Sequence, residues 1–293
     1  MTSHELIRMP AFVRWGVRVD RLPAGAWLGL QALALWPAWA WMARRLVDRS
    51  DDPQGLLALA ALAWLACVHR KALRASPALG WLAAATVLTL AATLARGALL
   101  PLPPLLAGLL AVLALAATLL AFLPRQVAAT PVLLLAVLAL PLLSSLQFYA
   151  GYPLRVLTAT ASQGLLAPFF TVLREGSALL VDGRLVIVDA PCSGVQMAWL
   201  GYFTAAATAL WAGLAERTVL ARLPMVGLTV LAGNVLRNTL LVAAEGAGRP
   251  LPAWGHEALG LAVLGAVCAA VAWQMQRPAA QPLSFGARHA HAA

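Results

Sequence analysis

Charged residues are scarce in this sequence: they make up 11% of its 293 residues, against about 25% in soluble domains. Lysine is almost absent, because Lys71 is the single lysine beside 20 arginines. This scarcity excludes an ordinary soluble domain. The net charge is +10, but the basic residues are scattered between apolar segments. We therefore interpret them as determinants of membrane topology and expect no nucleic-acid partner.

Cysteine is scarce as well, and the three cysteines are Cys67, Cys192 and Cys268. Their odd number and wide spacing exclude a disulfide framework and a thiolate metal site. The sequence also lacks a His/Glu pair at i, i+4, clustered acids and a glycine-rich phosphate loop, so we expect no metal and no cofactor. Cys67 and Cys268 lie within apolar runs, whereas Cys192 has polar neighbours.

Apolar residues are abundant, at 62% of the chain, and apolar runs of about 18 or more residues recur throughout. This pattern predicts an all-α polytopic membrane protein with about eight transmembrane helices. The first run lacks a clear cleavage site, so we interpret it as a retained span. The expected spans are about 24–43, 55–69, 77–97, 103–123, 130–148, 192–214, 223–244 and 255–274, with a kink at Pro141.

A longer segment without a predicted span precedes the sixth helix. There, two β-rich runs flank Asp182-Gly183, which predicts a small β-hairpin. The domains expected from these patterns are a basic cytoplasmic segment (1–23), N-terminal transmembrane helices (24–149), an extracytoplasmic amphipathic segment with the hairpin (150–191), transmembrane helices with the candidate catalytic residues (192–275) and a disordered cytoplasmic tail (276–293).

The distribution of basic residues predicts the orientation. With eight spans and a cytoplasmic N-terminus, 12 basic residues fall inside and 8 outside, which agrees with the positive-inside rule. The alternative is that the short run 55–69 is not a span, which gives seven spans and an N-terminus outside. The C-terminus is then cytoplasmic too, and the hairpin lies on the outer face. In this topology Cys192, Arg237 and His256 lie at similar depth near the outer face.

Cys192 is the candidate nucleophile. A cysteine reacts as its thiolate, and the pKa of a thiol falls at a helix N-terminus. Cys192 follows Pro191, a favoured first helical residue, and Asp189 is a candidate cap. The backbone N–H groups of Ser193 and Gly194 lie nearby in sequence and are candidates to stabilise an oxyanion. The alternative is that Cys192 is simply a small buried apolar residue.

Arg237 interrupts the apolar run of the seventh span. An arginine inside a membrane costs roughly 2.5–3.5 kcal/mol or more on insertion scales, so it usually faces a polar interior. Asn234, Arg237 and Asn238 share one helix face by their i, i+3, i+4 spacing. This cluster is a candidate to hold a carbonyl oxygen or a carboxylate. The alternative is that Arg237 extends to the outer membrane surface.

His256 is the one histidine that the topology predicts at the outer face. A histidine there can accept a thiol proton and later donate it to a leaving amine. The alternative is an interfacial capping residue. The other four histidines are expected in tails or in an inner loop: His4, His69, His289 and His291.

These residues resemble the exosortase/archaeosortase family, a family of polytopic membrane cysteine transpeptidases. The resemblance lies in Pro191-Cys192-Ser193-Gly194 at the start of one span, Asn234-x-x-Arg237 in the next and His256 at the start of the last. It also includes Tyr152-Pro153-Leu154-Arg155 and the hairpin, and covers roughly residues 145–275. The N-terminal half matches only as apolar spans.

The resemblance implies a multi-pass protein of the bacterial inner (cytoplasmic) membrane whose active site faces outside. It implies cleavage near the C-terminal sorting signal (PEP-CTERM-like) of exported proteins. The new carboxyl terminus then passes from the enzyme thioester to an acceptor, a membrane lipid or another molecule. By resemblance, Cys192 is the nucleophile, His256 the general acid/base and Arg237 the oxyanion stabiliser. Asn234 supports Arg237, and Ser193, Gly194, Asn238 and Arg155 are candidate substrate-binding or supporting residues.

Two other functions are also compatible with these residues. One is a membrane carrier or scaffold in which Arg237 binds an anionic substrate in a central cavity. The other is proteolysis in which water, not an acceptor, resolves the thioester. The sequence predicts no oligomeric state.

Overall fold

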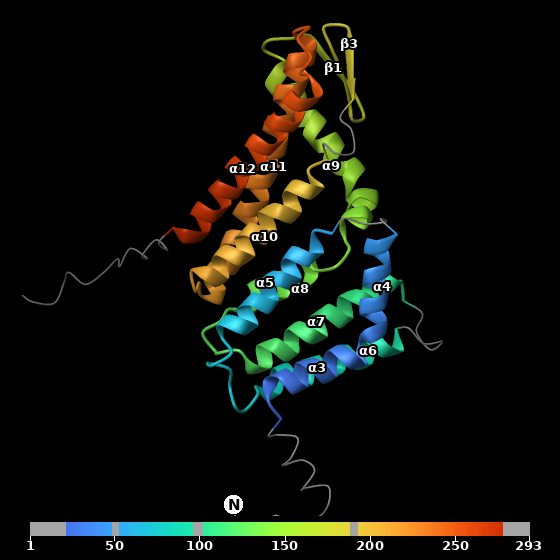
Figure 1. Cartoon of the computed structure of the whole chain (residues 1–293). Coiled ribbons are helices and arrows are strands. Elements are labelled where there is room, and N and C mark those ends of the chain that lie inside the picture. The colour runs from blue at the N-terminus through green and yellow to red at the C-terminus, as the bar shows by residue number, and fades with distance from the viewer. Residues whose placement is uncertain (1–21, 49–52, 96–101, 188–192, 278–293) are drawn as a thin grey trace, which may run out of the picture.

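A computed structural model of the chain describes residues 22–48, 53–95, 102–187 and 193–277. Within these ranges the protein is mainly helical with one small sheet, in agreement with the predicted helical class (Figure 1). Three of the described helices are long and apolar enough to cross a membrane, and a bent pair gives a fourth candidate. Other apolar helices are shorter than a span, so the count of eight stays a prediction.

The first group of helices runs from α3 to α8. Its first expected span is broken at Leu35, because Pro37 has no N–H group and its ring opposes a continuous helix. Pro104, by contrast, is placed at the start of a helix, where its missing N–H costs nothing. The helices are α3 (Ala24–Ala34), α4 (Trp36–Val47), α5 (Gly55–Val68), α6 (Leu79–Leu94), α7 (Pro104–Phe122) and α8 (Ala129–Leu138).

At the kink predicted at Pro141 the helix ends completely and a new helix begins. Helix α8 ends at Leu138, and α9 (Leu143–Leu166) begins after four residues and leaves at 95°. Helix α9 then continues through Pro153 without interruption. The domain boundary expected at residues 149 and 150 therefore falls inside one helix.

The sheet that follows α9 has three antiparallel strands in the order β1 (Val172–Glu175), β2 (Ala178–Val181) and β3 (Arg184–Ile187). Strands β2 and β3 form the predicted hairpin, and Asp182 and Gly183 both have positive φ, as its two-residue turn requires. Strand β1 was not predicted. The side chains of Leu179 and Val181 are buried against α9 and the end of α11, so the sheet is attached to the C-terminal helices.

The second group of helices is formed by α9, α10 (Val195–Trp211), α11 (Glu216–Gly246) and α12 (Ala253–Gln276). Helices α10, α11 and α12 contact one another pairwise, and small residues allow close packing. A Cβ at Gly233 of α11 would lie only 2.2 Å from Cγ2 of Val267 on α12. In Figure 1 this group lies above α3–α8, with the sheet at the top.

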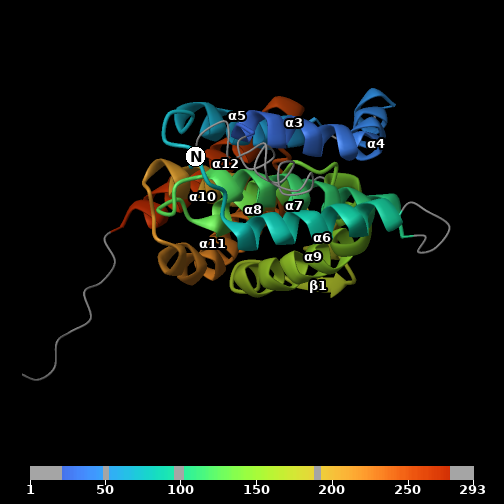
Figure 2. The ribbon, with the colours of Figure 1, turned by 90° about the horizontal axis from the view of Figure 1, so that it is seen from below.

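Helix α8 joins the two groups. It contacts α5 and α7 on one side and α10 on the other, and Figure 2 shows α7 and α8 between α3 and α9. The carboxylate of Glu216, at the start of α11, accepts hydrogen bonds from the backbone N–H groups of Ala129 (2.7 Å) and Thr130 (3.1 Å). This carboxylate therefore caps α8 from the neighbouring group.

Candidate active site

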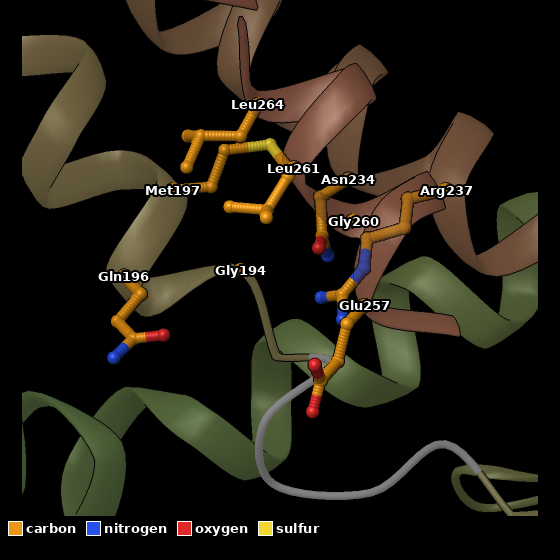
Figure 3. Close-up of a pocket in the computed structure, with 9 residues that line it drawn as sticks. All are labelled: Gly194, Gln196, Met197, Asn234, Arg237, Glu257, Gly260, Leu261 and Leu264. Carbon is orange, nitrogen blue, oxygen red and sulfur yellow. The ribbon is translucent and has the colours of Figure 1, made fainter. Parts of the chain in front are cut away.

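A cavity of about 340 Å³ lies where the start of α10, the second half of α11 and the start of α12 meet. Its lining combines charged, polar and apolar side chains. In Figure 3, Arg237 and Glu257 lie toward one end, and Met197, Leu261 and Leu264 toward the other. The lining residues are Gly194, Gln196, Met197, Asn234, Arg237, Glu257, Gly260, Leu261 and Leu264.

Arg237 enters this cavity from α11 and lies against α12. Its side chain is partly buried, and a Cβ at residue 260 would lie 3.2 Å from its Nε and 3.3 Å from its Nη2. Gly260 therefore provides the space in which the guanidinium lies. Sequence analysis identified Arg237 from its cost in the membrane, but Gly260 gave no signal in the sequence because glycine is common in apolar helices.

Asn234 and Asn238 are both 2% exposed on the same face of α11. Asn234 donates from Nδ2 to Oγ1 of Thr158 on α9 at 3.1 Å, and Asn238 donates from Nδ2 to the carbonyl of Asn234 at 2.8 Å. Asn234 lines the cavity, and Asn238 does not. Of the three predicted α11 residues, Asn234 and Arg237 therefore line the cavity, and Asn238 contacts it through Asn234.

The segment that enters α10 differs from the predicted one. Helix α10 begins at Val195, because Gly194 has φ +84°, a left-handed conformation that suits glycine. The helix therefore begins three residues after the start at about residue 192 that was expected for the sixth span. A Cβ at residue 194 would also lie 2.7 Å from Cγ of Asn234. Gly194 is thus required by its conformation and by its contact with α11.

Ser193 is 3% exposed and takes part in the helix start. Its hydroxyl donates to Oε1 of Gln147 on α9 at 2.7 Å and lies 3.4 Å from the N–H of Val195, which donates to it. Cys192 and the candidate cap Asp189 lie outside the described residues. Two peptide bonds join Cys192 to Gly194, which limits the distance between their Cα atoms to about 7 Å.

His256 lies in the first turn of α12 and is partly buried. It is one helical turn before Gly260, a rise of about 6 Å, and on the same side of the helix. The guanidinium of Arg237 lies over Gly260, so α12 places His256 one turn from that cation. His256 is not among the residues that line the cavity; its neighbour Glu257 is.

Arg155, a candidate from the resemblance alone, lies on α9 away from this cavity. Its guanidinium carbon is 5.7 Å from the centre of the Tyr152 ring. Arg155 shares a helix face with Thr158 and is therefore on the side of α9 that contacts α11. Arg155 is not among the residues that line the cavity.

Sequence reasoning missed Glu257, Gln147 and Thr158. A signal for the α9 residues existed, because Gln147, Gly151, Thr158 and Ser162 fall on one face at helical spacing. Glu257 gave no signal, since an acidic residue at a helix start is common at a membrane surface. Of the other cysteines, Cys67 is exposed on α5 and Cys268 is partly buried in α12. Among the described residues, no group of three or more His, Cys, Asp or Glu side chains could hold a metal ion.

The helical fold, with its apolar helices, is that of a membrane protein, and the mixed polar and apolar cavity is its candidate site. Comparison with protein families gives a match to the model described as transmembrane exosortase over residues 41–273. The chain therefore belongs to the transmembrane exosortase family. The match extends well into the N-terminal half, where the sequence motifs gave no resemblance. Comparisons with curated proteins and with solved structures give no match.

Proposed function

We propose that this protein is a membrane cysteine transpeptidase that cleaves the C-terminal sorting signal of exported proteins and transfers them to an acceptor. Membership of the exosortase family supports the reaction class. The single observation that carries the assignment of residues is the cavity in which Arg237, Asn234 and Gly194 meet, two residues beyond Cys192. The proposed location is the bacterial inner membrane, with both termini in the cytoplasm and the site outside.

The proposed reaction has two halves. The Cys192 thiolate attacks the scissile carbonyl, the carbon–nitrogen bond breaks, and His256 donates the proton that the leaving amine takes. The acceptor nucleophile then attacks the thioester, gives its proton to His256, and the carbon–sulfur bond breaks to regenerate the thiolate. In both halves Arg237 stabilises the negative oxygen of the tetrahedral intermediate.

The position of Arg237 suits this role. A guanidinium in a cavity with apolar walls interacts more strongly with a developing anion than one in water does. Gly260 leaves room for the guanidinium, and Asn234 contacts both Gly194 and the polar face of α9. Ser193, Gly194, Asn238 and Arg155 are supporting residues in this proposal.

The decisive experiment replaces Cys192 by alanine in cells that make a tagged protein with a C-terminal sorting signal. Processing is expected to stop with Cys192→Ala and to continue with Cys67→Ala and Cys268→Ala, which are matched controls in other helices. Unchanged processing with Cys192→Ala contradicts the enzyme assignment. Labelling of Cys192 in intact cells by a membrane-impermeant thiol reagent tests the outer location.

A carrier or scaffold is the second candidate, and one observation favours it. The cavity pairs the Arg237 cation with an apolar wall of Met197, Leu261 and Leu264, which would also suit an amphipathic anion. A carrier would tolerate Cys192→Ala and lose function with Arg237→Leu, whereas the transpeptidase is lost with either. Trapping the thioester and adding water or an amine acceptor separates hydrolysis from transfer.

A further inference from the structure

One face of α9 carries polar and small residues along most of its length. Gln147, Gly151, Thr158 and Ser162 occupy this face, and the last three are buried. Thr158 and Ser162 are hydrogen bonded to Asn234 and Thr239 of α11. Buried polar groups in an apolar chain are costly without partners, so this face is built to hold other segments in defined positions.

Near the start of α9, Gln147 on this face is hydrogen bonded to the segment that enters α10. Ser193 donates its hydroxyl proton to Oε1 of Gln147 at 2.7 Å and accepts from the N–H of Val195 at 3.4 Å. The two bonds run in one direction, from the helix N–H through the hydroxyl to the amide oxygen. Such a chain of bonds is mutually polarising and fixes the hydroxyl orientation.

Gly151 leaves the space that the Gln147 side chain uses. A Cβ at residue 151 would lie 3.0 Å from Nε2 and 3.1 Å from Cδ of Gln147. The amide of Gln147 therefore lies along its own helix, over the next turn. A side chain at residue 151 would press against this amide and disturb its bond to Ser193.

A second contact holds the next residue of the same segment. Gly194 lies against the amide group of Asn234, and Asn234 is itself hydrogen bonded to Thr158 of α9. Both residues that follow Cys192 are thus held, directly or through Asn234, by α9. Neither Gln147 nor Thr158 lines the cavity.

We propose that Gln147 is a positioning residue of the active site: it anchors Ser193, the residue that follows Cys192 in the chain, in the segment that enters α10. This inference rests on the proposed function, in which Cys192 is the nucleophile. Displacement of a reacting group by about 1 Å can cost a factor of about one hundred in rate. An anchor on a separate helix that fixes the residue next to the nucleophile therefore affects the chemical step more than substrate binding.

The test is a double-mutant cycle with Gln147→Leu and Ser193→Ala in full-length protein that keeps Cys192 as its single cysteine. Each variant is expected to lower kcat for processing by between about tenfold and about hundredfold, with little change in KM. The double variant is expected to be no worse than the more impaired single variant, because both remove the same bond. Multiplication of the two losses would contradict the proposal.

The pH dependence of thiol alkylation gives a readout that general destabilisation does not move. If the segment is displaced from the helix start, the rate of alkylation at Cys192 should need a higher pH to reach half of its maximum, closer to a free cysteine near about 8.5. Gln147→Glu keeps an acceptor for the Ser193 hydroxyl, so it should retain more activity than Gln147→Leu. An unchanged alkylation profile in Gln147→Leu would overturn the proposal.

Thr160→Val is the matched control on the same helix. Thr160 is exposed, and within the part of the chain that the structure describes its hydroxyl donates to the carbonyl of Val156 in α9 at 2.8 Å. This variant is expected to keep the kcat and the alkylation profile of the parent. The Cys192→Ala variant separates failure of this inference from failure of the proposed function. If the proposed function is wrong, Cys192→Ala leaves processing intact; if only the role of Gln147 is wrong, Cys192→Ala still stops it.

Discussion

In the N-terminal helices α3–α8 the buried side chains are almost all apolar, whereas the C-terminal helices bury several polar side chains that bond one another. Thr118 is the buried polar residue described in the first group, and its hydroxyl bonds within its own helix, to Ala114 at 3.0 Å. In the second group two such bonds join α11 to α9, from Asn234 to Thr158 and from Thr239 to Ser162. The buried polar residues there are Thr158, Ser162, Ser193, Asn234 and Asn238.

The cavities of the two regions differ in the same way. A second cavity of about 340 Å³ lies among α3, α4, α5, α7 and α8, and its lining residues are all apolar. Its one polar side-chain group, Nε1 of Trp39, already donates to the carbonyl of Ala32 at 2.8 Å. The cavity among α10, α11 and α12 has the same volume but contains Arg237 and Glu257. Burying polar groups is costly, so their concentration in the second group favours the candidate site there over the apolar cavity of the first group.

The largest expected effect is at the start of α10. Gly194→Ala introduces a Cβ 2.7 Å from Asn234 at a residue with φ +84°, so processing is expected to fall by more than about one hundredfold. Gly213→Ala is the matched control, because Gly213 has φ +60° and no atom near its Cβ position. It should lose only the backbone cost, roughly 1–2 kcal/mol of stability, and keep its activity. Equal losses of processing in the two variants would contradict the role of the Asn234 contact.

The second largest effect is expected from the loss of a hydrogen bond between two helices, compared with the loss of a hydrogen bond within one helix. Asn234→Leu removes the hydrogen bond to Thr158 and is expected to lower the free energy of unfolding by about 1–3 kcal/mol and to reduce processing. Thr118→Val in α7 removes a bond within its own helix and should lower the free energy of unfolding by less than Asn234→Leu does, by about 0.5–1.5 kcal/mol. Thermal unfolding in detergent measures both. A larger loss of unfolding free energy with Thr118→Val than with Asn234→Leu would contradict the view that hydrogen bonds between helices stabilise the second group more.

A smaller effect on processing is expected at Gly260, which lies against the guanidinium of Arg237. Gly260→Ala places a Cβ 3.2 Å from Nε of Arg237, so the guanidinium must move by a few tenths of an ångström. We expect processing to fall about tenfold without loss of folding. Gly265→Ala on the same helix has no atom near its Cβ position and should keep full activity. Processing assays of both variants at matched expression give the comparison.

The smallest effect is expected in the apolar cavity. Ala63 lines it, and Ala63→Leu adds volume where space exists, so stability should change by less than about 0.5 kcal/mol and processing should be unchanged. Ala58 on the same helix is fully buried, and Ala58→Leu should cost about 1–3 kcal/mol through overpacking. A loss of processing in a stable Ala63→Leu protein would show that the N-terminal region takes part in the reaction.

Local patterns in the sequence predicted much of this structure. The turn Asp182-Gly183 was found because it needs two residues with positive φ, and the break near Pro141 because proline opposes a helix. Strand β1 was missed because its four residues become a strand by pairing with β2, and this pairing is not visible in the residues of β1 themselves. The start of α10 was placed three or four residues early, because Pro191 suits a first helical turn but Gly194 is the residue that ends the non-helical segment.

For the site, the sequence by itself determined a membrane protein with an arginine and two asparagines on one helix face, since burial cost and helical spacing are properties of the chain alone. Only the tertiary structure decided that Gly260 makes room for Arg237, that Glu257 lines the cavity and that Gln147 holds Ser193, 46 residues away. Those contacts depend on the 95° turn between α8 and α9 and on how α9 packs against α10 and α11. Residues so far apart in the chain meet only when the helices are assembled.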